Sequence, residues 1–166
     1  AEGVAFRQLA HRLGVGFADV FADLAGANSL VQACSQVTSV FHCAGYAHAF
    51  STFSEEDSAK HWAVNFEGTR NFVEAAGLAG VRSFIFLSSV KAMAEPGEQC
   101  VDESFLGDPK TAYGQSKLAA EQAVLEAGRR YGMHVVNLRL AMVYGSGGRG
   151  NLERMGRLVK RRLFPP

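Results

Sequence analysis

The sequence lacks the features that mark membrane, secreted and nucleic-acid-binding proteins. Its 166 residues contain no apolar run approaching the roughly 18 residues of a membrane span. They also open without the charged-then-apolar layout of a signal peptide. The formal net charge is only +1, from 17 basic and 16 acidic residues spread along the chain, so no long-range field favours nucleic acid or an anionic surface. These absences predict a protein with no membrane partner and no nucleic-acid partner.

Cysteine is scarce as well. The three cysteines, Cys34, Cys43 and Cys100, are odd in number and lie too far apart for metal-ligand spacing. This usage argues against a disulfide framework and favours a reducing compartment. We therefore expect a cytoplasmic protein without a metal site, and we assign no role to His48 or His61.

What the sequence does contain is a repeated β-then-α rhythm. Its apolar share of 48% is enough for one packed core and about one domain. Continuous apolar runs such as FIFL (84–87) suit strands covered on both faces, and their alternation with helices implies parallel strands joined by right-handed crossovers. The pattern predicts an α/β fold with a doubly wound parallel sheet, with strands over 15–21, 37–43, 82–88 and 134–140 and helices over 28–35, 55–79, 111–131 and 151–162.

The helix over 111–131 is the best marked, because Pro109 stands just ahead of it and Gly132 ends it. Long connections, at 44–54 and 89–110, follow two of the strands and leave from the carboxyl edge of the sheet. Open α/β sheets bind ligands at that edge. Function is therefore expected in these connections.

Tyr113 and Lys117 lie four residues apart in the sequence YGQSK (113–117), so they share one face of this helix about one turn apart. A free tyrosine has a pKa of about 10, but a nearby ammonium favours the phenolate. Lys117 would then tune Tyr113 as a proton acceptor or donor, and it could also donate to a ribose. The pair alone is weak evidence, since most such pairs lie on the surface.

Two buried strands end in residues that suit a ligand. Ser88 and Ser89 close the run FIFLSS (84–89), where a hydroxyl could reach the same substrate oxygen as Tyr113 or could merely cap loop amides. The run VFHCAG (40–45) ends in small residues that permit close approach of a cofactor. Its His42 is read as structural rather than catalytic.

Charged groups near the two ends of the chain leave alternatives open. Asp23 follows the strand over 15–21 and could accept a hydrogen bond from an adenine amino group, or it could cap the next helix. The basic residues between 149 and 162 could form a solvated helix face or could meet a substrate phosphate.

Taken together, the motifs resemble those of the extended short-chain dehydrogenases/reductases, the NAD-dependent epimerase/dehydratase group, over essentially the whole chain. They occur in the order and spacing of that family: DL (23–24), FHCAG (41–45), VNFEGT (64–69), FLSS (86–89), YGQSK (113–117), LR (138–139) and VYG (143–145).

The resemblance implies a Rossmann-like fold, NAD as cofactor with NADP as an alternative, and a site drawn from these motifs. Ser89, Tyr113 and Lys117 are the implied catalytic triad, and Asn65 is expected to brace the strands. The implied cofactor-binding residues are Asp23, Leu24, His42, Cys43, Ala44, Gly45, Asn65, Leu87, Ser88, Tyr113, Lys117 and Leu140. The implied substrate-binding residues are Ser89, Lys91, Tyr113 and Asn151.

Within the family, the segments SSVK (88–91) and GRGNL (148–152) resemble UDP-glucose 4-epimerases and related nucleotide-sugar reductases. The leading hypothesis is a nucleotide-sugar 4-epimerase, and the first alternative is a one-way 4-keto reductase of the same site. A catalytically silent NAD(P)-sensing or scaffold protein is the rival from another class. Dehydration is disfavoured, because Val90 and Lys91 stand where dehydratases carry an acidic pair. A homodimer through the helix of Tyr113 is a further expectation from the resemblance.

Family members open with a strand and a glycine-rich turn that cradles the pyrophosphate at a helix N-terminus, and no such turn occurs in this sequence. We therefore expect residues 1–166 to be a partial NAD(P)-binding domain that binds NAD poorly by itself, with 146–166 leading into a substrate-binding lobe. The first two family strands are expected to be missing between the strand over 15–21 and the strand over 37–43.

Overall fold

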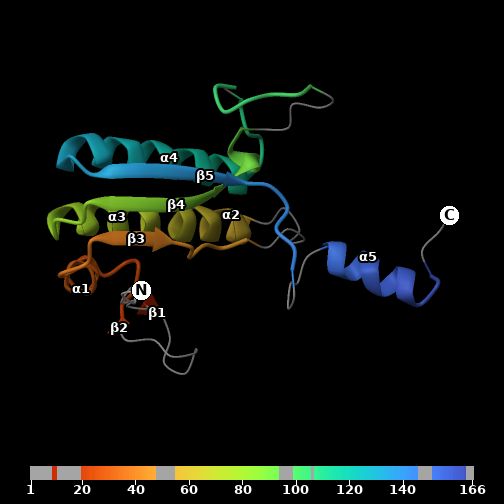
Figure 1. Ribbon diagram of the computed structural model, residues 1–166, viewed down its shortest axis with the longest axis horizontal. Coiled ribbons are helices and arrows are strands. Elements are labelled where there is room, and N and C mark those ends of the chain that lie inside the picture. The colour runs from red at the N-terminus through yellow and green to blue at the C-terminus, as the bar shows by residue number, and fades with distance from the viewer. Residues whose placement is uncertain are drawn as a thin grey trace, which may run out of the picture.

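The computed structural model describes residues 9–10, 20–47, 55–93, 99–105, 107–145 and 151–163. Figure 1 shows a layer of strands against a layer of helices, which confirms the predicted β-then-α rhythm. In chain order the elements are β1 (Leu9–Ala10), β2 (Val20–Phe21), α1 (Ala27–Ala33), β3 (Ser39–His42), α2 (Glu55–His61), the π-helical segment η1 (Trp62–Glu67), α3 (Gly68–Leu78), β4 (Ser83–Ser89), the 3-10 turn η2 (Val90–Met93), α4 (Ala112–Tyr131), β5 (His134–Leu140) and α5 (Asn151–Lys160).

Three of the strands form the main sheet, in the order β3-β4-β5 and all parallel. The central strand β4 pairs Val40 with Phe84 on one side and Ser89 with Leu140 on the other. Because all three strands run the same way, their carboxyl ends meet at one edge. The segments that follow His42, Ser89 and Leu140 leave from this edge, as the sequence predicts.

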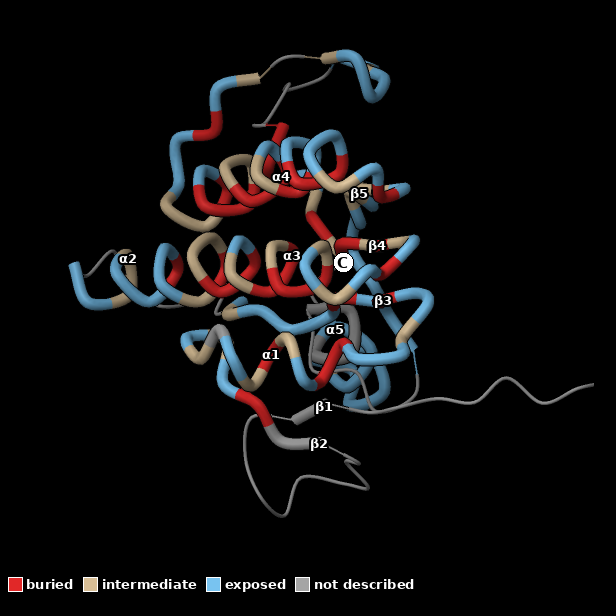
Figure 2. The backbone as a smooth tube through the Cα atoms, turned by 90° about the vertical axis from the view of Figure 1, so that its left-hand side faces the viewer, coloured by how far each residue is buried: buried red, intermediate tan, exposed pale blue. Residues whose placement is uncertain are grey.

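The core lies between this sheet and the helices α1, α3 and α4, which Figure 2 shows on one side of the strands. Alternate residues of β4 are buried, with Phe84 and Phe86 fully enclosed, because successive side chains of a strand point to opposite faces. On the other face Phe41 is 65% exposed. The apolar runs predicted strands covered on both faces, whereas in the described part of the chain the helices of the core cover one.

At the amino-terminal end, residues 15–19 of the strand expected over 15–21 lie outside the described residues. Only Val20–Phe21 of the expected strand over 15–21 is a strand in the described residues, and it pairs in parallel with β1 (Leu9–Ala10). Strand β1 was not predicted, because a two-residue strand is too short to leave a periodic signal. Among the described residues, β1 and β2 form a sheet of their own beside β3-β4-β5.

Helix α4 follows the sequence closely. Thr111 is its N-cap, and the Thr111 side chain accepts a hydrogen bond from the amide of Gly114. Gly132 ends the helix in the left-handed conformation, at φ 63°. A Cβ at Gly128 would lie 2.7 Å from Val135, so this glycine lets α4 approach β5 closely.

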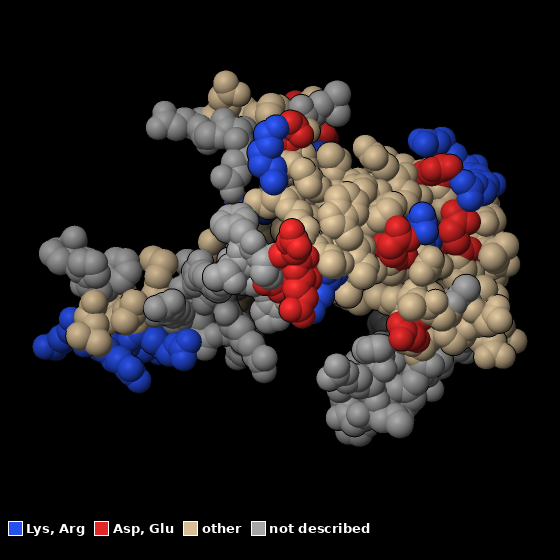
Figure 3. Space-filling view, turned by 180° about the vertical axis from the view of Figure 1, so that it is seen from behind, with Lys and Arg blue, Asp and Glu red and all other residues tan. Residues whose placement is uncertain are grey.

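Helix α5 stands apart from the sheet in Figure 1. Its basic side chains, Arg157 and Lys160, together with Arg161 and Arg162 just beyond it, gather at one end of the molecule in Figure 3. Residues 155–163 are almost all exposed, which is the solvated face that the sequence analysis considered. No helix in the described ranges is long and apolar enough to cross a membrane.

Candidate active site

The first turns of α4 bring Tyr113 and Lys117 to the carboxyl end of β4. The Lys117 side chain is buried, and its ammonium donates to the carbonyl of Leu87 at 2.8 Å and lies 4.5 Å from the centre of the Phe86 ring. Tyr113 is half-buried one turn earlier on the same helix. The structure therefore brings together the predicted Tyr113, Lys117 and Leu87.

Burial also changes the charge behaviour of Lys117. Loss of water contact lowers the pKa of Lys117 from 10.5 to about 8, although the negative charge of Glu121 acts in the opposite direction. Lys117 is thus still cationic at neutral pH and loses its proton in mildly alkaline solution. A cation held there can stabilise negative charge on a neighbouring oxygen.

This shift predicts how stability varies with pH. Because the folded pKa of Lys117 lies below the unfolded one, the unfolded chain binds more protons between about pH 8 and 10.5, and folding is favoured as pH rises through that window. Urea unfolding of wild type and Lys117→Met at several pH values isolates this effect. We expect the stability of the Met variant relative to wild type to be highest at pH 7 and to shrink towards pH 10. A difference that stays constant from pH 7 to 10 would contradict this assignment.

Ser88 and Ser89 point to opposite faces of β4. The Ser88 hydroxyl is buried and donates to a carboxylate oxygen of Glu121 at 2.6 Å. A cofactor contact of Ser88, as the resemblance implies it, could therefore involve only its main chain. The Ser89 hydroxyl is half-buried and accepts from the amide of Lys91 at 3.2 Å, so the capping alternative describes its contact in this structure. That contact leaves the hydroxyl proton available for a substrate oxygen.

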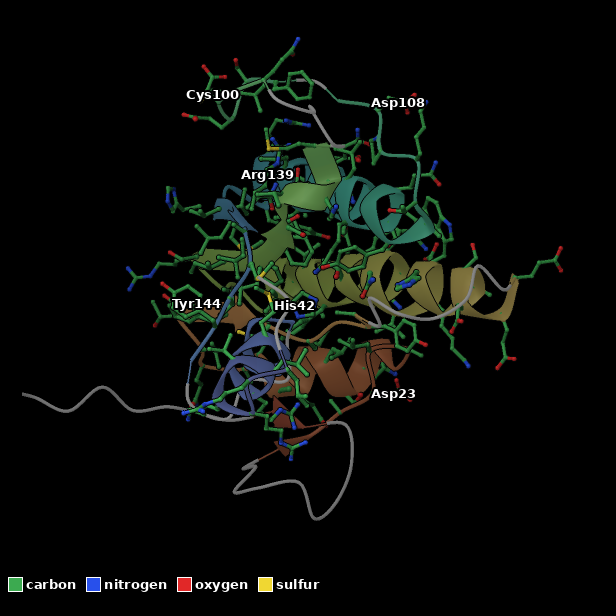
Figure 4. All side chains as sticks on the ribbon, turned by 90° about the vertical axis from the view of Figure 1, so that its right-hand side faces the viewer. Asp23, His42, Cys100, Asp108, Arg139 and Tyr144 are labelled. Atoms are coloured by element: carbon green, nitrogen blue, oxygen red, sulfur yellow. The ribbon has the colours of Figure 1, made fainter. Side chains whose placement is uncertain are left out.

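Glu121 is the centre of a buried polar cluster behind Ser89. It is 3% exposed and receives three hydrogen bonds from the guanidinium of Arg139: Nε donates to Oε1 at 3.0 Å and to Oε2 at 3.2 Å, and a terminal nitrogen donates to Oε2 at 2.8 Å. Arg139 also donates to the carbonyl of Glu103 at 3.2 Å. Figure 4 shows Arg139 on the same side of the molecule as α4 and η2, far from Asp23. The cluster thus ties together α4, β4, β5 and the segment around Glu103.

The segment after β3 is held in place by Asn65. The Asn65 amide accepts from the amide of Tyr46 at 2.7 Å and donates to the carbonyl of Tyr46 at 3.0 Å. Asn65 lies in η1, and such π-helical segments are rare and often occur at functional sites. Asn65 was expected to brace the strands, whereas these two hydrogen bonds hold the main chain of the segment that follows β3.

Gly45 lies between this brace and Lys117. A Cβ at Gly45 would lie 3.3 Å from Oδ1 of Asn65 and 3.6 Å from Nζ of Lys117. Cys43, Ala44 and Gly45 are exposed. Their small side chains therefore leave the main chain open to a ligand beside the ammonium of Lys117.

His42 belongs to the core. Its ring is 1% exposed, lies against the rings of Phe72 and Phe86, and shares a hydrogen bond of 2.9 Å with the Thr69 hydroxyl. Burial, assisted by the charge of Lys117, lowers the pKa of His42 to about 3. His42 is therefore neutral and structural, as its position suggested, and the cofactor contact implied by the resemblance can involve only its main chain.

The residues expected on the adenine side lie near α1. The Asp23 carboxylate accepts from the amide of Ala25 at 3.0 Å, and Gly26 is the N-cap of α1. Asp23 thus caps the turn before the helix rather than the helix itself. Leu24 is half-buried against Gly68, and its carbonyl accepts from the Asn71 side chain at 3.0 Å.

The remaining predicted site residues are Leu140, Lys91 and Asn151. Leu140 ends β5 opposite Ser89, and its side chain is exposed. Lys91 is exposed in η2. Asn151 is the first residue of α5, but its side chain lies outside the described part of the structure.

Gly114, next to Tyr113, lets the first turn of α4 pack closely against η2. A Cβ at Gly114 would lie 2.5 Å from the carbonyl oxygen of Lys91 and 2.9 Å from Pro109. We expect Gly114→Ala to push α4 away from η2 and to lower the free energy of unfolding by about 1–3 kcal/mol, the usual cost of overpacking. Gly156→Ala in α5, where nothing lies within 4 Å, is the matched control. Chemical denaturation checks both, and a Gly114→Ala protein as stable as its control would refute the close contact.

Two residues of the site, Tyr46 and Glu121, were not considered in the sequence, and a third, His61, was assigned no role there. Glu121 stands four residues after Lys117, and Ser88 faces Arg139 across the β4–β5 pairing. The burial of Glu121 depends on this pairing of strands, which is a tertiary contact. His61 stands four residues before Asn65 in one helical stretch, so the two share a face.

The residues present fit one part of an NAD site. The exposed main chain at Gly45 and the ammonium of Lys117 lie within a few ångströms of each other, and such groups suit a ribose and a nicotinamide. The glycine-rich turn that would hold a pyrophosphate is not in the sequence. No group of three His, Cys, Asp or Glu side chains in the described ranges could hold a metal ion.

Known proteins resemble this chain in sequence and in structure. Residues 3–163 match the NAD dependent epimerase/dehydratase family. The chain is 34% identical over 133 residues to a UDP-glucose 4-epimerase of Vibrio cholerae, and the alignment covers 78% of this chain and 40% of that protein. A short-chain dehydrogenase/reductase superfamily protein from Agrobacterium tumefaciens with bound NAD has a TM-score of 0.69 and 33% identity, over 80% of this chain and 40% of that one. The UDP-glucose 4-epimerase of Thermus thermophilus in complex with NAD has a TM-score of 0.63 and 30% identity, over 72% of this chain and 40% of that one.

The chain thus spans about 40% of the length of these three relatives. The predicted Rossmann-like α/β fold is confirmed by the parallel sheet and by the solved structures it resembles. The family match extends over nearly the whole chain, as the ordered motifs predicted. The chain belongs to the NAD-dependent epimerase/dehydratase family of extended short-chain dehydrogenases/reductases.

Proposed function

We propose that the protein is an NAD-dependent nucleotide-sugar 4-epimerase that acts on UDP-glucose or a closely related sugar. The observation that carries the proposal is the meeting of Tyr113, Lys117 and the end of β4 at the carboxyl edge of the sheet. Relatives named UDP-glucose 4-epimerase support this choice. NAD, when bound, supplies the redox chemistry, accepting the C4 hydrogen of the sugar with its electron pair and giving it back.

The residues of the chain supply the proton chemistry. Tyr113 takes the proton of the C4 hydroxyl as the sugar is oxidised, and it returns a proton to the same oxygen after the keto-sugar has turned over. Ser89, whose hydroxyl proton is free of its contact with Lys91, donates to that oxygen. Lys117 contributes a nearby positive charge and holds the ribose, and Cys43, Ala44 and Gly45 let the cofactor approach the main chain.

The remaining site residues are assigned outer positions. Asp23 and Leu24 are proposed on the adenine side, Leu140 beside the nicotinamide, and Lys91 and Asn151 on the nucleotide diphosphate. The side chains of His42 and Ser88 are proposed to support the site from within the core without touching a ligand, because both are buried. The intact enzyme is proposed to be a cytoplasmic homodimer.

A one-way 4-keto reductase is the alternative that keeps the same residues. The two reactions differ in net cofactor use, because a reductase would consume one reduced cofactor for each product molecule, whereas an epimerase consumes none. A dTDP-D-glucose 4,6-dehydratase is also a relative, at 36% identity over 106 residues, but Val90 and Lys91 after Ser89 provide no acidic pair for loss of a sugar hydroxyl.

The cofactor balance separates epimerase from reductase. The protein expressed from its whole gene would be incubated with UDP-glucose and NAD while absorbance at the NADH band and product composition are followed. We expect UDP-galactose to form without net change in reduced cofactor. If a 4-keto sugar is turned over only as NADH or NADPH is consumed in equal amount, the reductase is correct.

A further inference from the structure

His61 occupies a buried position between two tyrosines of the site. It is 6% exposed and is the last residue of α2. Its ring centre lies 4.9 Å from that of Tyr46 and 5.5 Å from that of Tyr113, the latter in an edge-on arrangement. The imidazole therefore lies against the Tyr113 ring on one side and against the segment after β3 on the other.

A hydrogen bond fixes the orientation of this imidazole. Because Oδ1 of Asn65 accepts from the amide of Tyr46, the Nδ2 group of Asn65 must act as the donor towards its other neighbours. One of them is Nδ1 of His61, at 3.3 Å. This contact assigns Nδ1 as the acceptor, so neutral His61 carries its proton on Nε2.

The partners of His61 are themselves held in place. The Tyr46 hydroxyl donates to Asp57 of α2 at 2.8 Å, and its main chain is braced by Asn65. On the other side, Ser116 donates to the carbonyl of Tyr113 at 2.9 Å and lies 3.4 Å from Nδ2 of Asn65. His61 and Asn65 thus connect the first turn of α4 to the segment Cys43–Ala47 through contacts on both sides.

We propose that His61 is a positioning residue for Tyr113: its ring sets the angle of the Tyr113 phenol relative to the segment that follows β3. The inference rests on the proposed function, in which Tyr113 exchanges a proton with the substrate. Because small displacements of a reacting group cost much of the rate, a ring held on one side by His61 reacts faster than one free to tilt. The substrate need not touch His61.

The test compares two variants of the whole-gene protein. His61→Phe keeps a ring between the tyrosines and loses the nitrogen, whereas His61→Asn keeps a polar group and loses the ring. We expect His61→Asn to lower kcat by about 10- to 100-fold, with KM and NAD affinity changed less than about threefold, and His61→Phe to restore most of kcat. His134→Asn, at the exposed start of β5, is the matched control and should be unaffected.

A second measurement is independent of turnover. In protein with 13C-labelled tyrosine rings, the Tyr113 signal is identified by its loss in Tyr113→Phe. We expect this signal to shift in His61→Asn and to stay in place in His134→Asn. Normal kcat in folded His61→Asn, or an unmoved Tyr113 signal, would overturn the proposal. An inactive wild-type protein would instead refute the proposed function, while the NMR shift would still report on the contact.

Discussion

Replacing Tyr113 by phenylalanine is expected to lower kcat by about 10²- to 10⁴-fold, the range that general acid–base catalysis supplies. The substitution removes one oxygen atom and keeps the ring that lies against His61. The fold should therefore be retained, and NAD affinity should stay within about twofold, since the phenol serves the substrate oxygen in this account. Steady-state kinetics and NAD titration measure the two effects separately.

Tyr131→Phe is the matched control for this experiment. Tyr131 ends the same helix α4, and its hydroxyl donates to Glu74 at 2.8 Å, away from the site. Its loss should leave kcat unchanged. A Tyr113→Phe enzyme that keeps more than about a tenth of wild-type kcat would exclude Tyr113 as the proton carrier, because it would fall outside the range expected for such a group.

The second large effect is on stability. Removing Arg139 leaves the buried carboxylate of Glu121 with the Ser88 hydroxyl as its remaining side-chain hydrogen-bond donor. Breaking a buried ion pair from one side typically costs about 3–5 kcal/mol. We therefore expect Arg139→Met to lower the free energy of unfolding by about 3 kcal/mol in chemical denaturation.

Arg130 provides a matched arginine on the surface. It pairs with Glu74 at 2.9 Å and with Glu126 at 2.7 Å, and the exposed fractions of the three side chains are 51%, 31% and 63%. Exposed pairs contribute at most about 1 kcal/mol, so Arg130→Met should be nearly neutral. The double variant Glu121→Gln with Arg139→Met should recover part of the loss, because it removes the unpaired charge. Equal losses in the two arginine variants would show that burial adds nothing to the Glu121–Arg139 pair.

The sequence predicted those parts of the fold that depend on local pattern. The helix from Ala112 to Tyr131 was predicted because Pro109 stands just ahead of it and Gly132 ends it. Strand β5 (His134–Leu140) follows an apolar run of matching length. The pairing of β1 with β2 depends on contacts between short segments, which no period in the sequence reveals.

The site was predictable in its motifs but not in its supports. Tyr113 and Lys117 are recognisable because four residues separate them on a helix. The burial of Glu121 could not be predicted, because an acidic residue on a helix usually faces water. In this fold Ser88 and Arg139 point inward and donate hydrogen bonds to the buried Glu121 carboxylate. Likewise, nothing in the order of residues shows that η1 turns Asn65 towards Tyr46 and His61. Such contacts arise from tertiary packing between distant segments.

The fate of the C4 hydrogen distinguishes the proposed epimerase from enzymes that take hydrogen from solvent or from added NADH. UDP-glucose carrying deuterium at C4 would be incubated with NAD and the protein expressed from its whole gene, and the product would be examined by NMR and mass spectrometry. If Tyr113 manages the proton while the same hydrogen leaves and returns to C4, the UDP-galactose formed will retain its deuterium. Product with protium at C4, acquired from solvent or from added NADH, would contradict the proposed epimerase.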